Sequence, residues 1–262
     1  MTRSSLLRKR FFKDEAPEIV PVKIKGQGAF GMVFEAIDPK LKKRVAVKRM
    51  RKSDFKASRE LLILEQLCKS KGCVQMLDAF YTVNKKKQLT QNVVMEYIDD
   101  SLENFINSHK KRGMYIPVEI LKNLMKQLLE GLKGVHSKDI CHRDLKPDNI
   151  LINKKEEVKI CDFGCSKTLV PDSKRNNIPH IVSRYYRAPE LILCHVKYSV
   201  KVDLWALGCI FIELFTRNPL FPGATEGLQF LEQIAVLGTN IFYYSFNLFQ
   251  LTLFSNIPNF YF

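Results

Sequence analysis

The sequence lacks the patterns of a disulfide framework, a zinc site and a secretory leader. Its seven cysteines include no C-x-x-C pair and have no histidines at metal-ligand spacing. The first residues mix Leu and Phe with Arg and Lys, which argues against a signal peptide. We therefore expect free thiols in a reducing compartment, the cytoplasm or the nucleus.

Acidic residues are scarce relative to basic ones. The chain has 42 Lys and Arg against 27 Asp and Glu, giving a net charge of +15. The basic runs lie apart, in segments expected to be loops, and lack the interleaved aromatic residues of a single-strand binder: Lys85–Lys87, Lys110–Arg112 and Lys154–Lys155. We favour a solvated surface, with attraction to acidic or phosphorylated partners as the alternative, and expect neither nucleic acid nor membrane as a partner.

The last segment contains no charge at all. Residues 240–262 include no Asp, Glu, Lys, Arg or His, and nine of these 23 residues are Phe or Tyr. A transmembrane helix needs about 20 predominantly apolar residues, but Asn, Ser, Gln and Pro interrupt this stretch. We expect an atypical uncharged tail here, not a membrane span.

The hydrophobic pattern predicts an α+β fold in two parts. Residues 20–50 alternate apolar and polar positions with turn signals, which predicts three strands. A short strand at 93–95 runs into a connection near residue 98. Beyond it the chain is mostly helical. The expected helices cover residues 55–68, 117–136, 202–215 and 226–237.

A glycine-rich turn lies between the first two expected strands. Gly26, Gln27, Gly28 and Gly31 belong to a G-x-G-x-x-G pattern, and glycines let a backbone approach phosphates closely. Dinucleotide-binding folds share this pattern but continue directly into a helix. Here a strand at 33–37 follows, which favours a hairpin covering ATP.

A lysine on a core strand follows this turn. Lys48 ends the sequence V-A-V-K, 17 residues after Gly31. A buried lysine is costly unless paired, and Glu60 on the next expected helix is its natural partner. Such a pair could hold the α- and β-phosphates. Taken alone, the motif fits a surface lysine on an edge strand equally well.

Two further motifs supply the groups that phosphoryl transfer requires. Residues 142–149 are H-R-D-L-K-P-x-N, and D-F-G follows 18 residues after Asp144. The chemistry needs a carboxylate that orients a hydroxyl, a carboxylate that holds magnesium and an oxygen ligand for a second metal ion. Asp144, Asp162 and Asn149 would supply these in turn, and A-P-E at 188–190 closes the segment.

These five motifs together resemble the eukaryotic protein kinase set, over residues 20 to about 238. The resemblance implies a two-lobed fold with ATP and two Mg²⁺ ions in the cleft. Lys146 resembles the catalytic-loop lysine of the serine/threonine branch. The resemblance also implies five positions around adenine: Val33, Ala46, Met95 as gatekeeper, and Glu96 and Ile98 at the hinge.

More specific segments, at 55–61 and 183–192, closely resemble the glycogen synthase kinase-3 family. That resemblance implies protein substrates already phosphorylated four residues C-terminal to the target, held by three basic residues. The matching residues are Arg59, Arg143 and Lys167. The alternative is that Arg143 pairs with a phosphorylated loop residue while Lys167 is solvated.

Two departures from this family affect regulation and completeness. His180 replaces the activation-segment tyrosine, and the uncharged tail begins where the family continues into further helices and a scaffold-docking surface. We expect a basic extension at 1–19, an N-lobe at 20–98, an incomplete C-lobe at 99–239 and the tail at 240–262. The competing hypothesis is an inactive truncated fragment that binds ATP or partners without turnover.

Overall fold

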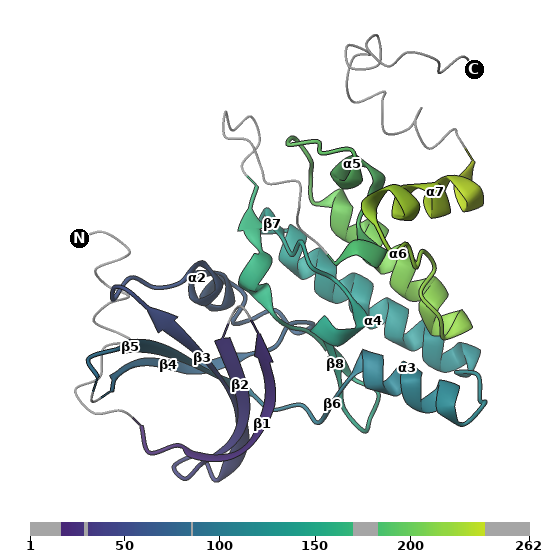
Figure 1. Cartoon of the computed structure of the whole chain (residues 1–262). Helices are drawn as coiled ribbons and strands as arrows, with labels where there is room; N and C mark the ends of the chain where they lie inside the picture. Colours follow the sequence, from purple (N-terminus) through teal and green to yellow (C-terminus); the bar gives the residue numbers. More distant parts are fainter. Residues whose placement is uncertain (1–16, 29–30, 85, 170–182, 239–262) are drawn as a thin grey trace.

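Two lobes make up the part of the chain that the computed structural model describes, which is residues 17–28, 31–84, 86–169 and 183–238 (Figure 1). A β-sheet forms the first lobe and helices dominate the second, so the predicted α+β, two-lobed arrangement is confirmed. His180, the uncharged tail and most of the N-terminal extension lie outside the described residues.

The N-lobe is a five-stranded antiparallel sheet with the strand order β1-β2-β3-β5-β4. Its strands are β1 (Val20–Gly28), β2 (Gly31–Asp38), β3 (Lys43–Lys52), β4 (Met76–Val83) and β5 (Leu89–Glu96). In β3, Val45 and Val47 are fully buried on one face, while Ala46 and Lys48 alternate with them on the other. Strand β4 was not predicted, and β5 begins before the short strand expected at 93–95.

The helix expected at 55–68 is shorter in the structure. Helix α2 covers Arg59–Gln66 because the Ser58 hydroxyl accepts a hydrogen bond from the Leu61 amide at 3.2 Å and caps the first turn. Its buried face includes Leu61 and Leu64. Helix α2 packs against the 3-10 turn η2 (Phe163–Cys165), which directly follows Asp162.

The described part of the C-lobe contains the helices α3 (Leu102–Lys111), α4 (Val118–His136), α5 (Pro189–Ile192), α6 (Lys201–Thr216) and α7 (Glu226–Leu237). Short elements connect them: β6 (Asp100–Ser101), β7 (Ile140–Cys141), β8 (Ile150–Ile152), β9 (Val158–Ile160), β10 (Lys167–Thr168), η1 (Pro147–Asn149) and η3 (Arg184–Tyr186). Helix α3 was not predicted. Lys110 and Lys111 therefore lie in its last turn and not in a loop, at the end where the helix dipole favours cations.

Helix α6 matches the apolar helix expected at 202–215, but it differs in two respects from a purely apolar element. It carries two buried acids, Asp203 and Glu213. Leu204, Phe211 and Phe215 are 43–57% exposed, so one face of the helix is not covered by the described residues. The two acids matter for the site below.

A contact between two glycines holds helix α4 against the loop between α2 and β4. A Cβ atom added to Gly72 would lie 2.3 Å from the Cα of Gly131 on α4. The Gly72 carbonyl also accepts a hydrogen bond from Ile160 at 2.9 Å. The backbones therefore meet directly, and the loop is fixed on both sides.

Replacing Gly72 with alanine should lower the free energy of unfolding by about 1–3 kcal/mol, because the new methyl group forces the two backbones apart. Urea denaturation of the purified chain measures the change. Gly134→Ala is the matched control on the same helix, since its nearest contact would be at 3.8 Å, and it should be neutral or stabilising by up to about 1 kcal/mol. Equal effects at the two positions would contradict the close contact.

All seven cysteines are free thiols in the structure. Across the ranges that the structure describes, no helix combines the length and apolarity that crossing a membrane requires.

Candidate active site

One face of the N-lobe sheet carries the residues expected around adenine. Val33 pairs with Lys48 between β2 and β3, and Ala46 pairs with Met95 between β3 and β5. Directly opposed side chains in antiparallel strands lie on the same face, and Ala46 and Lys48 are two residues apart on β3. The sheet therefore presents all four side chains together. Glu96 ends β5, and the half-buried Ile98 follows in the connection.

The glycine-rich turn is a strand-to-strand hairpin, as the sequence predicted. Gly28 at the end of β1 pairs with Gly31 at the start of β2. Gly31 has φ +117, and a Cβ there would lie 2.2 Å from the carbonyl oxygen of Arg49. Only glycine fits this position. Gly26 and Gly28 have no atoms within 4 Å of an added Cβ, so the surface of β1 at these positions is open.

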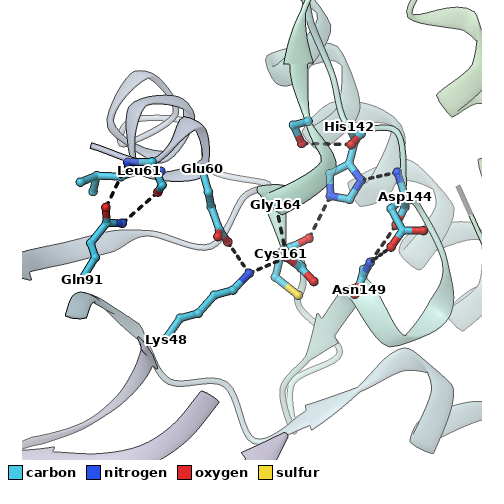
Figure 2. Close-up of polar contacts among 12 residues, drawn as sticks. Lys48, Glu60, Leu61, Gln91, His142, Asp144, Asn149, Cys161 and Gly164 are labelled. Atoms are coloured by element: carbon cyan, nitrogen blue, oxygen red, sulfur yellow. Dashed lines mark hydrogen bonds and ion pairs between the residues drawn. The ribbon is translucent and has the colours of Figure 1, made fainter. Parts of the chain in front are cut away.

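Lys48 is the centre of a buried ion cluster (Figure 2). Its Nζ lies 2.7 Å from Glu60 Oε1 and 2.7 Å from Asp162 Oδ1. Burial acts to lower the pKa of Lys48, but the two carboxylates outweigh it and raise the pKa above its ordinary value. Lys48 is therefore a fixed cation. Burial raises the pKa of Glu60, while the Lys48 charge opposes that shift.

Asp162 adopts a conformation that few non-glycine residues use. It has φ 57 and ψ 71, and its side chain accepts a hydrogen bond from the Gly164 amide at 3.3 Å. Burial acts to raise the pKa of Asp162, but the charge and hydrogen bond of Lys48 lower it below the usual value. The side chain is 35% exposed, so the ionised carboxylate remains accessible to solvent.

Ser183 and Asn149 hold the Asp144 carboxylate with three hydrogen bonds. Its Oδ1 accepts hydrogen bonds from the Ser183 amide and hydroxyl, each at 2.9 Å. Its Oδ2 accepts one from Asn149 Nδ2 at 3.1 Å, and the same nitrogen donates to the Asp144 carbonyl at 2.8 Å. A carboxylate has about four acceptor sites, so one remains for an incoming hydroxyl. The half-buried Lys146 follows two residues later.

Ser183 is a site residue that sequence reasoning missed. It appeared only as part of the segment 183–192, and the motif gave it no role. Its contact with Asp144 spans 39 residues, so no local pattern could reveal it. The available signal was the serine immediately before R-Y-Y-R.

Asp203 is the second missed residue, and it fixes the loop that carries Asp144. Its carboxylate accepts hydrogen bonds from the amides of His142 at 2.8 Å and Arg143 at 2.9 Å. His136 Nε2 lies 2.8 Å from the same group. Asp203 is 1% exposed. Helix α6 thus anchors the backbone of the H-R-D motif, and the His142 ring in turn contacts the Cys161 carbonyl at 2.9 Å.

The residues expected to bind magnesium suit such an ion. Asn149 uses its amide nitrogen for both hydrogen bonds to Asp144, so its oxygen remains an acceptor. Asp162 uses Oδ1 towards Lys48 and Gly164, which leaves Oδ2. Within the described residues, no group of three or more His, Cys, Asp or Glu could hold a metal by itself. Magnesium on nucleotide phosphates needs only one or two protein ligands, because phosphate and water supply the others.

The three basic residues expected to hold a substrate phosphate lie on helix α2, in the loop after β7 and on strand β10. Arg59 is exposed at the first position of α2, which packs against η2. Lys167 is half-buried on β10, and β10 pairs with β7 just before Arg143. Arg143 is 4% exposed, and it donates to the Cys165 carbonyl at 2.7 Å and the Tyr198 hydroxyl at 3.0 Å.

A second buried acid on α6 supports the segment after Ser183. The Tyr186 hydroxyl donates to Glu213 Oε2 at 2.7 Å, and Glu213 is 4% exposed. Burial raises the pKa of Glu213 to about 7, although the Tyr186 hydrogen bond opposes that shift. Glu213 therefore titrates close to neutral pH.

Stability should fall as pH rises through the Glu213 pKa. Between about 4.5 and 7 the folded chain retains a proton that the unfolded chain has lost, so the loss from pH 5 to 8 should be about 2–3 kcal/mol. Glu213→Gln should remove this component, because a neutral amide does not titrate. Urea denaturation at both pH values measures it, with Glu232→Gln on the exposed side of α7 as the control. Parallel pH curves for wild type and Glu213→Gln would contradict the prediction.

Comparison with known proteins is consistent with this geometry. The protein kinase domain family matches residues 20–249. A protein of Dictyostelium discoideum described as probable serine/threonine-protein kinase glkA is 41% identical over 226 residues, which cover 85% of this chain and 46% of the relative. The chain therefore spans about half the length of that relative.

Proposed function

The chain belongs to the protein kinase family, and from this premise we propose that it transfers the γ-phosphoryl group of ATP to serine and threonine hydroxyls of proteins. The observation that carries the proposal is the ion cluster in which Lys48 Nζ lies 2.7 Å from both Glu60 and Asp162. It joins the sheet, helix α2 and the D-F-G segment into one arrangement, and transfer requires all three together.

Each charged group has a role in this reaction. Lys48 is a fixed cation where the α- and β-phosphates would lie, and Glu60 holds it in place. Asp162 and Asn149 offer the oxygen ligands for magnesium. When bound, Mg-ATP supplies the transferable phosphoryl group and the metal charge that neutralises it. Val33 and Ala46 would enclose the adenine ring, Met95 would lie beside it, and the Glu96 and Ile98 backbones would contact its edge.

Asp144 orients the substrate hydroxyl. Ser183 and Asn149 occupy both of its oxygens and fix the carboxylate plane. The one remaining acceptor site is available to the hydroxyl proton, and Asp144 would take up that proton as the hydroxyl oxygen bonds to the γ-phosphorus and the bond from that phosphorus to the ADP leaving group breaks. Lys146, two residues away, stabilises the negative charge on the transferring group.

We further propose that the substrates are primed, as in the glycogen synthase kinase-3 family. The support is that α2, which begins at Arg59, packs against η2, while Lys167 lies on β10, which pairs with β7 just before Arg143. Arg143 bonds to two neutral oxygens, on Cys165 and Tyr198. A phosphate dianion adds attraction between opposite charges and can accept two parallel hydrogen bonds from the guanidinium, which a single neutral oxygen cannot do, so it can compete for Arg143.

The test is the transfer rate to a peptide with phosphoserine four residues after the target serine, relative to its unphosphorylated form. We expect a ratio above about ten, since a charged hydrogen bond contributes about 1.5–3 kcal/mol. Arg59→Glu should bring the ratio close to one. Lys56→Glu, at a lysine with an 84% exposed side chain, is the control and should leave it unchanged.

Two other outcomes have distinct meanings. Equal rates on both peptides would remove the priming proposal and leave the kinase proposal intact. If the purified chain transfers no phosphate to either peptide while Mg-ATP still raises its melting temperature, the chain binds nucleotide without turnover.

A further inference from the structure

A polar cavity of about 510 Å³ lies outside the catalytic cleft. It is formed by the loop between α2 and β4, by helix α4, and by strand β9 with the residue before it. Val158 and six polar residues line it: Lys69, Lys71, Gln75, Gln127, Glu157 and Lys159. None of these residues has a role in the reaction proposed above.

The walls of the cavity are fixed by hydrogen bonds to backbone. Gln75 Nε2 donates to the carbonyls of Ser70 and Cys73, both at 2.8 Å. Gln127 donates to the Glu156 carbonyl at 2.9 Å and accepts from the Val158 amide at 3.0 Å. The contact between Gly72 and Gly131 fixes the same loop on α4. A preformed cavity of this kind loses little entropy when a ligand binds.

The charge of the cavity is positive and only partly neutralised. Its lining carries three ammonium groups and one carboxylate. Lys159 lies 3.0 Å from Glu96 Oε1, and Glu157 accepts a hydrogen bond from Asn153 at 2.6 Å. Lys69 and Lys71 are exposed, and neither forms an ion pair with any residue in the described ranges. Two cations therefore face the opening without a partner.

We propose that this cavity is a docking site for an acidic polypeptide segment, whose carboxylate or phosphate side chains bind Lys69 and Lys71. The volume is within the range of about 300–1,000 Å³ typical of ligand sites, which suits one or two acidic side chains. No aromatic residue lines the cavity, so it lacks the platform on which nucleic-acid bases stack. The site is separate from Arg59, Arg143 and Lys167, and it does not depend on priming.

Fluorescence anisotropy with the full chain tests the proposal, using a fluorescein-labelled octaglutamate peptide as the probe. The double variant Lys69→Glu/Lys71→Glu should bind at least tenfold more weakly than wild type. Lys40→Glu/Lys43→Glu makes the same charge change at exposed lysines near the β2–β3 turn, and it should bind within about twofold of wild type. Equal losses in the two double variants would show that only net charge matters and would overturn the proposal.

Further arms separate the sources of binding. A phosphoserine peptide of matched charge distinguishes phosphate from carboxylate, and tighter binding of either one still supports the site. Arg59→Glu should bind octaglutamate as wild type does. Loss of binding in that variant would place the peptide at the proposed priming site and overturn the cavity. Tighter binding of an oligothymidylate of equal charge would also overturn it.

Folding of the variants is checked by thermal melting. If the charge-reversed double variant melts well below wild type, Lys69→Gln/Lys71→Gln replaces it. This variant should bind octaglutamate at least threefold more weakly than wild type. Unchanged binding in a folded glutamine variant would contradict the assignment.

Discussion

Asp144→Asn should reduce phosphoryl transfer by about 10²–10⁴-fold while leaving Mg-ATP binding unchanged. An amide cannot accept the hydroxyl proton, and loss of a positioned general base typically has an effect of this size. The geometry around residue 144 should survive, because the asparagine oxygen can still accept from Ser183. The change therefore isolates the chemical role of the carboxylate from its structural one.

Transfer of labelled phosphate measures the rate, and the Mg-ATP-dependent rise in melting temperature measures binding. Asp148→Asn is the matched control, since Asp148 is exposed on η1 only four residues away. It should retain a rate within about threefold of wild type. If Asp144→Asn kept more than a tenth of the wild-type rate, Asp144 would not be the base.

Asp203→Ala should have the largest effect on stability, lowering the free energy of unfolding by about 3–5 kcal/mol. The carboxylate is buried and accepts hydrogen bonds from the His142 and Arg143 amides. Without it, both amides are buried and unsatisfied, at a cost of about 1–3 kcal/mol each. A domain is stable by only about 5–15 kcal/mol, so the variant should be close to unfolding at 37 °C.

Urea denaturation measures this change, and Leu204→Ala is the control. Leu204 is the next residue on the same helix but is 47% exposed, so Leu204→Ala should lower the free energy of unfolding by less than about 1 kcal/mol. The stability of Asp203→Asn should lie between those of Asp203→Ala and Leu204→Ala, because one side-chain oxygen can still accept a hydrogen bond. An Asp203→Ala variant as stable as Leu204→Ala would show that the catalytic loop does not depend on α6.

The reactive groups could be predicted from sequence because the chemistry dictates both residue type and spacing. Lys48 and Glu60 were expected as a pair on the basis of the cost of a buried lysine, and their nitrogen and oxygen lie 2.7 Å apart. The two-lobed fold followed from the switch between period-2 and helical patterns. These predictions depend on local constraints that a short stretch of sequence displays.

The supporting groups were not predictable, because their partners are distant in the chain. Asp203 lies 60 residues from the Arg143 amide, and on a mostly apolar helix the acid itself was the signal in the sequence. Helix α3 was missed because its pattern is mostly polar, with only Leu102 and Ile106 buried. Helix α2 was expected to begin at residue 55, but it begins at Arg59, because the Ser58 hydroxyl caps its first turn.

The edge strand β1 is the part of the N-lobe sheet that can separate most easily from the rest. Every one of its nine residues is exposed, and within the sheet its only neighbour is β2. Separation of β1 therefore breaks only its hydrogen bonds to β2, while the buried side chains of β3 and β5 remain in place. Amide protons of β1 should therefore exchange with solvent well before those of β5.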